Sequence, residues 1–229
     1  MEKRILAIGA HIGDMELTAG GILAQCAVSG GHIATLALTA GEKAAPPDCD
    51  LAEFRKQKVS EAEAFTKILG GRSYVFDYED GILPDNEEVR WKTADIIRAE
   101  KPDLIITHHD VSMHKDHECC HRIVKDAWFY AALPSFKREL PAHFAHLYFA
   151  ENWEDAVDYH PYIYREISED AFKLWQKAVV THEFVTKSKS FEYFEYYSHL
   201  MRVRGIEARK SYAETFECSP EEIRVIQSI

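Results

Sequence analysis

Apolar residues in the first half of the chain fall into short runs, which alternate with longer segments where they recur at helical spacing. Such runs predict buried strands and amphipathic helices respectively. The expected strands cover residues 4–9, 32–38, 73–77 and 103–107. The expected helices cover residues 16–29, 51–69 and 87–100, and glycine pairs end the first two. Strands and helices therefore alternate along this half.

The second half of the chain predicts helices at residues 115–132, 168–182 and about 191–209, with strands at 146–150 and 162–166. Parallel strands need crossover helices, so the alternation predicts an α/β fold with a doubly wound, mostly parallel sheet and helices on both faces. The chain has no internal repeat and no linker-like stretch. We therefore expect a single domain over residues 1–229.

The stretch AIGAHIGDMELTAGG, residues 7–21, places His11 and Asp14 directly after the first expected strand. Doubly wound sheets bind ligands at the carboxyl ends of their strands, which favours a functional site. A structural role is also open, because Asp14 could cap the next helix and His11 could bond to the backbone. The glycines here do not have G-x-G-x-x-G spacing, so the stretch does not favour a dinucleotide site.

The stretch THHDVSMHKDHECCH, residues 107–121, follows another expected strand and is rich in histidine. His114 and His117 share one helical face if a helix begins there. Imidazole and carboxylate are ordinary zinc ligands, and a catalytic zinc site has three protein ligands and one open position. His11, Asp14 and one histidine of this stretch would supply such a set. The adjacent Cys119 and Cys120 point in different directions on a helix, so we expect them to pack rather than bind metal.

These two stretches resemble the signature motifs of the PIG-L/LmbE-like family of zinc-dependent N-deacetylases, which includes GlcNAc-PI de-N-acetylase-like proteins. Residues 10–14, Ala-His-Ile-Gly-Asp, match the family motif A-H-P-D-D in three positions, and residues 114–117, His-Lys-Asp-His, match H-x-D-H in full. The resemblance implies a Rossmann-like fold over at least residues 1–130. It also implies that Zn²⁺, or another divalent metal, is bound by His11, Asp14 and His117.

The same resemblance implies roles for residues around the metal. His114 would stabilise the oxyanion or protonate the leaving amine, and Asp116 would orient His114. The family also has an Arg-x-x-Glu-Ala pattern that binds substrate. Here Lys58 stands where the arginine is expected and Arg55 lies one helical turn earlier, so we expect Lys58 and Arg55 to bind substrate.

Gly13 is the main departure from the family pattern, because it stands where the family has the aspartate taken to be the general base. General acid–base catalysis typically contributes about 10²–10⁴-fold to the rate. Three outcomes are open: Glu16, Asp110 or another acid supplies the base, the metal activates water without one, or the site binds without turnover. If only the base is missing, Gly13→Asp should raise the rate.

The expected function is therefore that of a zinc-dependent hydrolase, an N-deacetylase that removes an N-acetyl or similar N-acyl group from an amino sugar or related small conjugate. The alternative is a catalytically impaired, metal-binding member of the same fold. A nucleotide-binding domain that needs no metal is a third hypothesis.

Composition limits the partners. The formal net charge of −11, without a cluster of lysine and arginine, argues against nucleic acid and an anionic membrane surface. No apolar run approaches the roughly 18–20 residues of a membrane span, and the five cysteines do not form a disulfide framework. We expect a cytoplasmic protein with a small N-acetylated substrate, no nucleic acid and no membrane. The aromatic C-terminal third leaves a homo-oligomer open.

Overall fold

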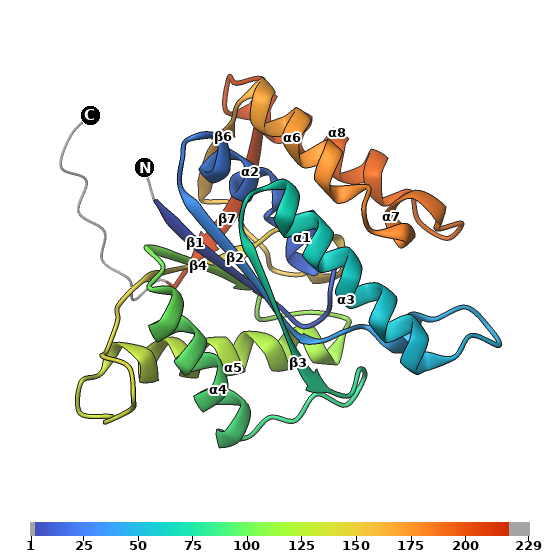
Figure 1. Ribbon diagram of the computed structural model, residues 1–229. Coiled ribbons are helices and arrows are strands. Elements are labelled where there is room, and N and C mark those ends of the chain that lie inside the picture. The colour runs from blue at the N-terminus through green and yellow to red at the C-terminus, as the bar shows by residue number, and fades with distance from the viewer. Residues whose placement is uncertain (1–2, 220–229) are drawn as a thin grey trace.

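The computed structural model describes residues 3–219, and the strands in this range form one sheet in the order β3-β2-β1-β4-β5-β7-β6 (Figure 1). The strands are β1 (Arg4–Gly9), β2 (His32–Thr39), β3 (Arg72–Tyr78), β4 (Leu104–His108), β5 (His146–Ala150), β6 (Ile163–Ile167) and β7 (Tyr212–Cys218). Strands β1 to β5 pair in parallel, whereas β7 is antiparallel to both β5 and β6. The predicted mostly parallel sheet is confirmed.

Helices cover both faces of this sheet. They are α1 (Asp14–Thr18), α2 (Gly20–Val28), α3 (Leu51–Ile68), α4 (Glu87–Glu100), α5 (Lys115–Ala132), α6 (Glu169–Val179), α7 (Glu183–Lys187) and α8 (Tyr193–Glu207), with 3₁₀ turns η1 (Glu42–Ala44) and η2 (Trp153–Asp155). Figure 1 shows α4 and α5 on the opposite side of the sheet from α2, α3 and α6.

The central strand β1 is buried on both of its faces, as a doubly wound sheet requires. Ile5 and Ala7 pack into the core under α2, α3, α6 and α8, whereas Leu6 and Ile8 pack into the core under α4 and α5. Side chains alternate between the faces of a strand, so a continuous apolar run supplies both cores. This explains why β1 reads as uninterrupted apolar sequence.

The helix expected at residues 16–29 is two helices, α1 and α2, which meet at Ala19. Trp175 of α6 packs into this junction: a Cβ at Gly20 would lie 2.4 Å from its indole ring, and its Nε1 donates to the Glu16 carbonyl at 2.9 Å. Helical spacing continued through residues 16–29, so the sequence pattern did not reveal the break. The tertiary contact explains it.

The chain after β6 also differs from expectation. The helix predicted at residues 168–182 ends at Val179, and the short helix α7 follows. Strand β7 was not predicted, because the buried acids Glu214 and Glu217 interrupt its apolar pattern. Glu214 is satisfied by the N–H groups of Gly21 and Ile22, each at 2.7 Å, at the start of α2.

Two composition-based expectations can be compared with the described residues. Cys119 and Cys120 are buried, and burial raises the pKa of both thiols, to about 11 for Cys119, which suits packing rather than ligation. Within residues 3–219, no helix combines the length and the apolar character that a membrane crossing demands.

Candidate metal centre

Loops that follow β1, β3, β4 and β5 bring polar side chains to one edge of the sheet. His11 lies between β1 and α1, Asp80 follows β3, His108 ends β4, and Asp155 lies in η2 after β5. All these strands are parallel, so their carboxyl ends share one edge. This is the edge at which a doubly wound sheet is expected to bind ligands.

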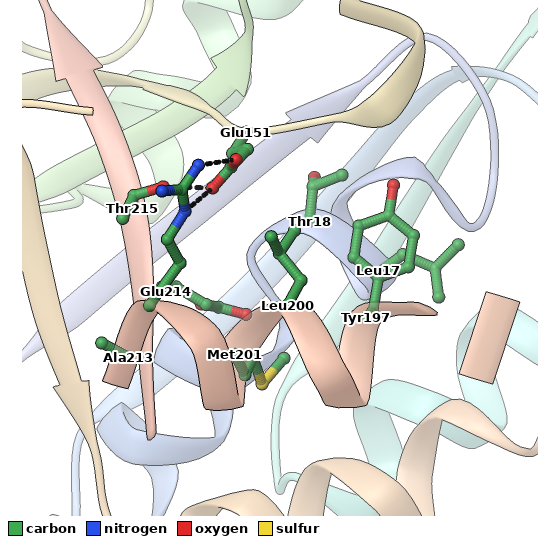
Figure 2. Close-up of a pocket in the computed structure, with 10 residues that line it drawn as sticks. Leu17, Thr18, Glu151, Tyr197, Leu200, Met201, Ala213, Glu214 and Thr215 are labelled. Atoms are coloured by element: carbon green, nitrogen blue, oxygen red, sulfur yellow. Dashed lines mark hydrogen bonds and ion pairs between the residues drawn. The ribbon is translucent and has the colours of Figure 1, made fainter. Parts of the chain in front are cut away.

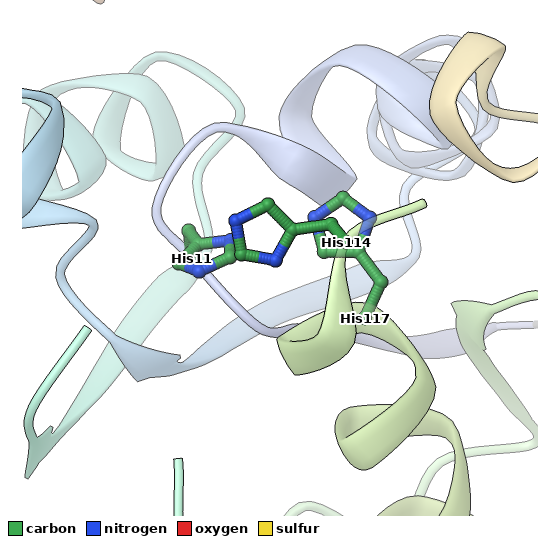
Figure 3. Close-up of side chains that lie close together, drawn as sticks. All are labelled: His11, His114 and His117. Atoms are coloured by element: carbon green, nitrogen blue, oxygen red, sulfur yellow. The ribbon is translucent and has the colours of Figure 1, made fainter. Parts of the chain in front are cut away.

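The Asp14 carboxylate lies between the two other predicted metal ligands, His11 and His117. Its Oδ2 lies 3.3 Å from His11 Nδ1 and 3.6 Å from His117 Nε2. Figure 3 shows the rings of His11, His114 and His117 grouped together, and the His11 and His117 ring centroids are 5.3 Å apart. Residues far apart in sequence thus meet at one point.

His108 is a further imidazole at this point that the sequence analysis did not assign. Its side chain is fully buried, its Nε2 lies 3.0 Å from Asp14 Oδ2, and its ring stacks on His117 with centroids 4.0 Å apart. Among the described residues, three groups have ligand atoms close enough to share an ion: Asp14, His108 and His117; His11, His114 and His117; and His11, Asp80 and Asp116. The predicted ligands His11, Asp14 and His117 are spread over these groups and do not form one of them by themselves.

The residues of this centre fit a divalent metal. Two imidazoles and a carboxylate are an ordinary donor set for zinc. His11 Nε2 is buried and has no aligned hydrogen-bond partner among the described residues, although Asp80 Oδ1 lies 3.1 Å away and Asp116 Oδ2 3.5 Å away. This nitrogen faces the separate group formed with Asp80 and Asp116, whereas the other ring nitrogen of His11, Nδ1, faces Asp14.

Asp116 does not orient His114 in the expected way. The Nδ1 of His114, the N-cap of α5, accepts a hydrogen bond from the Asp116 backbone N–H at 3.3 Å. The Asp116 carboxylate instead accepts from the Gly81 N–H at 2.7 Å and faces His11. Asp116 therefore contacts His114 through its backbone, and its side chain belongs to the surroundings of His11.

Gly13 begins α1 with φ of 110°, and the space beside it is filled. A Cβ at this position would lie 2.5 Å from Cζ of Phe184, a residue of α7. Lys58 Nζ lies 4.2 Å from the centroid of the same ring. An aromatic ring thus occupies the space that the side chain of the family's aspartate would need. The expectation that Gly13→Asp raises the rate has to be corrected, because the new side chain would meet this ring.

Of the two predicted substrate-binding residues, Lys58 lines the cavity and Arg55 does not. Lys58 Nζ donates to the Ile12 carbonyl at 3.1 Å, and burial lowers the pKa of this ammonium group. Arg55 lies 3.2 Å from Glu42 and donates to the Phe76 carbonyl at 2.8 Å. Arg55 therefore binds to the backbone of β3 and to Glu42. These contacts do not support the expected contact of Arg55 with substrate.

A cavity of about 920 Å³ opens beside the metal group, within the size range of small-molecule sites. Its walls come from the η1–α3 loop, α3, η2 and the α7–α8 segment. The residues that line it include Pro46, Phe54, Lys58, His114, Trp153, Glu154, Phe184, Lys189 and Tyr193. A separate cavity beneath α8 (Figure 2) has about 10 Å³, and Arg204 Nε donates to Glu151 at 2.9 Å in its wall. It has room for one water at most.

Neither named candidate for the missing base faces the cavity. Glu16 is buried, and its Oε2 caps α1 by accepting the Gly13 N–H at 3.0 Å. Asp110 is exposed and pairs with His109 at 3.3 Å. Glu154 does line the cavity, 3.8 Å from His117 Nδ1. Burial, together with nearby carboxylates, raises the pKa of Glu154 to about 7. Glu154 lies four residues after the predicted strand 146–150, so an acid in the loop that follows a strand is the signal that could have identified it.

Charge pairing dominates the electrostatics of the centre. Burial alone would raise the pKa of Asp14, but the adjacent imidazoles hold it well below its usual range. Burial would likewise lower the pKa of His11, yet Asp14, Asp116 and Asp80 raise it well above its usual value. In the metal-free protein Asp14 is therefore ionised, which is the state a metal ligand needs, whereas His11 carries a proton that a bound metal would have to displace.

Residues 6–128 match the family model described as "PIG-L: GlcNAc-PI de-N-acetylase". The chain belongs to this family. Both predicted motifs lie inside the matched region, so the resemblance drawn from them is confirmed.

Curated relatives within the family are named as deacetylases. The chain is 29% identical over 176 residues to a 1D-myo-inositol 2-acetamido-2-deoxy-alpha-D-glucopyranoside deacetylase of Thermomonospora curvata, covering 64% of this chain and 59% of the relative. It is 28% identical over 142 residues to a diacetylchitobiose deacetylase of Thermococcus kodakarensis, covering 59% and 53% respectively. The matches thus span little more than half the length of these relatives.

The fold is also that of a solved structure, the 4-carboxy-2-hydroxymuconate hydratase of Pseudomonas putida, with a TM-score of 0.88. The match covers 99% of both chains at 21% identity. At this identity the likeness supports the shared fold alone.

Proposed function

We propose that this chain is a zinc-dependent amide hydrolase that removes an N-acetyl or similar N-acyl group from an amino sugar or related small conjugate. The observation that carries the proposal is the meeting of His11 Nδ1, Asp14 Oδ2 and His117 Nε2 beside a cavity of about 920 Å³. The names of the curated relatives, which are deacetylases of N-acetylated sugars, support this substrate class.

His11, Asp14 and His117 would hold the metal. When bound, the ion would polarise the amide carbonyl and acidify water. Asp14 supplies the negative charge of the donor set, and both imidazoles present a nitrogen toward its carboxylate. All three residues line the cavity in which a substrate would bind.

His114 borders the cavity next to this set, with its ring centroid 4.7 Å from those of His11 and His117. It would hold the oxyanion or deliver a proton to the leaving amine, as a side chain within reach of both groups can do. Lys58 lies at the same wall and would contact the substrate.

A second candidate is a metal-binding protein of this fold that does not hydrolyse amides. The Phe184 ring favours it, because this ring takes the space of the residue that would act as general base. Glu154 is the carboxylate on the cavity wall that could compensate, and Glu154→Gln tests it directly.

Metal content and amine release together test both candidates. Purified protein is analysed for bound divalent metal and then assayed on a panel of N-acetylated sugars, with His114→Ala as the control variant. We expect stoichiometric metal and amine release that falls by about 10²–10⁴-fold in His114→Ala. Absence of metal would reject both candidates, and full turnover without His114 would reject its assigned role.

Metal binding without amine release would favour the second candidate. The panel includes an unsaturated carboxylic acid, since the Pseudomonas putida neighbour is named a hydratase. If the unsaturated acid is consumed and no amine is released, the proposed deacetylation would be wrong, and addition of water to a double bond would take its place.

A further inference from the structure

Asp155 is a fully buried carboxylate of η2 to which neither signature motif assigns a role. Its Oδ1 lies 3.0 Å from His117 Nδ1, and its Oδ2 lies 3.1 Å from His108 Nδ1. The Ser112 hydroxyl also donates to Oδ1. One carboxylate thus accepts from two stacked imidazoles, one oxygen for each ring.

The opposite nitrogens of these two rings face the metal centre. His117 Nε2 and His108 Nε2 lie 3.6 and 3.0 Å from the same Asp14 oxygen. An imidazole that donates its Nδ1–H to a carboxylate keeps that nitrogen protonated and has its ring orientation held. For His117, a neutral ring held in this way has its lone pair on Nε2, on the side of Asp14. His108 lies between two carboxylates, with Nε2 3.0 Å from Asp14 and Nδ1 3.1 Å from Asp155.

We propose that Asp155 is the positioning residue of the metal centre: it holds His117 and His108 with protonated Nδ1 atoms, so that their Nε2 atoms face Asp14. The proposal rests on the proposed metal function in one respect, which is that His117 Nε2 binds the ion. Removing a partner of this kind from a ligand histidine typically weakens metal binding by about 10–100-fold.

Glu154 provides the matched control, since it is the adjacent residue and carries the same charge. Its carboxylate lies 3.8 Å from His117 Nδ1, beyond hydrogen-bond distance. At pH 8, above the pKa of about 7 that Glu154 has, Asp155→Asn and Glu154→Gln each remove a negative charge near the centre. Only Asp155→Asn removes an acceptor from an imidazole. A difference between them therefore reports on the hydrogen bonds rather than on net charge.

The first measurement is the zinc dissociation constant, obtained by competition with a chromophoric chelator. We expect Asp155→Asn to raise it by about 10–100-fold, and Glu154→Gln by no more than about 5-fold, the effect of a weakly coupled charge. Equal effects of the two variants, or no effect of Asp155→Asn, would overturn the proposal.

The second measurement is the protonation of the ring nitrogens, from long-range ¹H–¹⁵N spectra of the metal-free protein, with His108→Gln and His117→Gln for assignment. In the parent protein both rings should carry a proton on Nδ1. An amide has one acceptor oxygen, so in Asp155→Asn at least one ring should lose that proton. Unchanged spectra in a folded Asp155→Asn would overturn the proposal.

If Asp155→Asn does not fold, the ¹H–¹⁵N spectrum of the parent protein still tests the proposal. An unprotonated His117 Nδ1 in that spectrum would contradict it directly. This readout needs no metal. If the parent protein binds no divalent ion, the proposed function fails, while the spectra still decide what Asp155 does.

Discussion

Replacing Gly13 by alanine should destabilise the protein through two separable effects. Gly13 has φ of 110°, a conformation that side chains with a Cβ rarely adopt. The added methyl group would also lie 2.5 and 2.7 Å from Cζ and Cε1 of Phe184. Real Cβ atoms do not approach carbon so closely, so the ring or the backbone must move.

The size of the loss can be worked from these two effects. A left-handed backbone costs a residue with a Cβ roughly 1–2 kcal/mol. Forcing an extra methyl group into a packed space typically costs about 1–3 kcal/mol. We therefore expect Gly13→Ala to lower the free energy of unfolding by about 2–5 kcal/mol.

Gly30→Ala is the matched control, because Gly30 has φ of 75° and an added Cβ there has no neighbour within 4 Å. It should lose only the backbone part, about 1–2 kcal/mol. Phe184→Ala removes the ring, so the loss caused by Gly13→Ala should shrink by about 1–3 kcal/mol when Phe184 is already alanine.

Urea unfolding of the four variants and the parent, followed by circular dichroism, measures these differences. A Gly13→Ala variant no less stable than Gly30→Ala would refute the packing argument, as would an additive double variant. The same logic applies to Gly13→Asp, in which the carboxylate would have to displace the ring before it could act as a base.

Three further predictions concern buried polar groups. Burial would raise the pKa of Glu100, but hydrogen bonds from Tyr74 and His32 lower it. The stability that the Glu100 carboxylate gives the folded protein is therefore present above the pKa of the unfolded state and is lost as pH falls through the pKa of the folded state. Glu100→Gln should therefore lower the free energy of unfolding by about 1–3 kcal/mol at pH 7 and by less at pH 3, in urea titrations at both pH values. The buried Arg98 donates to the carbonyls of Tyr130, Ala131, Leu133, Phe136 and Leu140, so Arg98→Met should cost about 3 kcal/mol. Arg138→Met, which breaks a surface pair with Asp95, should cost no more than about 1 kcal/mol in the same assay. His182 is fully buried, neither ring nitrogen has a hydrogen-bond partner among the described residues although Glu61 lies 3.9 Å from Nδ1, and burial lowers the pKa of His182 to about 3. His182→Leu should therefore raise the free energy of unfolding by up to about 1 kcal/mol in urea, and a loss of stability instead would show that the ring has a polar partner.

The sequence predicted the strands and helices of the first half closely, because apolar periodicity there reflects burial in two cores. The helix expected at residues 115–132 has the observed bounds of α5. Patterns failed where a distant residue decided the local structure. Trp175 packs into the break between α1 and α2, where helical spacing continues. The buried acids of β7 have distant partners: Glu214 accepts from the amide groups of Gly21 and Ile22 in α2, and Glu217 accepts from the His160 N–H and lies 2.8 Å from His109.

The site divides in the same way. The motifs by themselves determined the family and singled out His11, Asp14 and His117 as candidate ligands, because residue type and spacing are what a motif records. Only the tertiary structure decided what surrounds them. Asp155 comes to His117 from a loop after β5, and Phe184 comes to Gly13 from α7. Such partners are selected by packing between elements that are distant in sequence, and a local pattern holds no information about contacts of that kind.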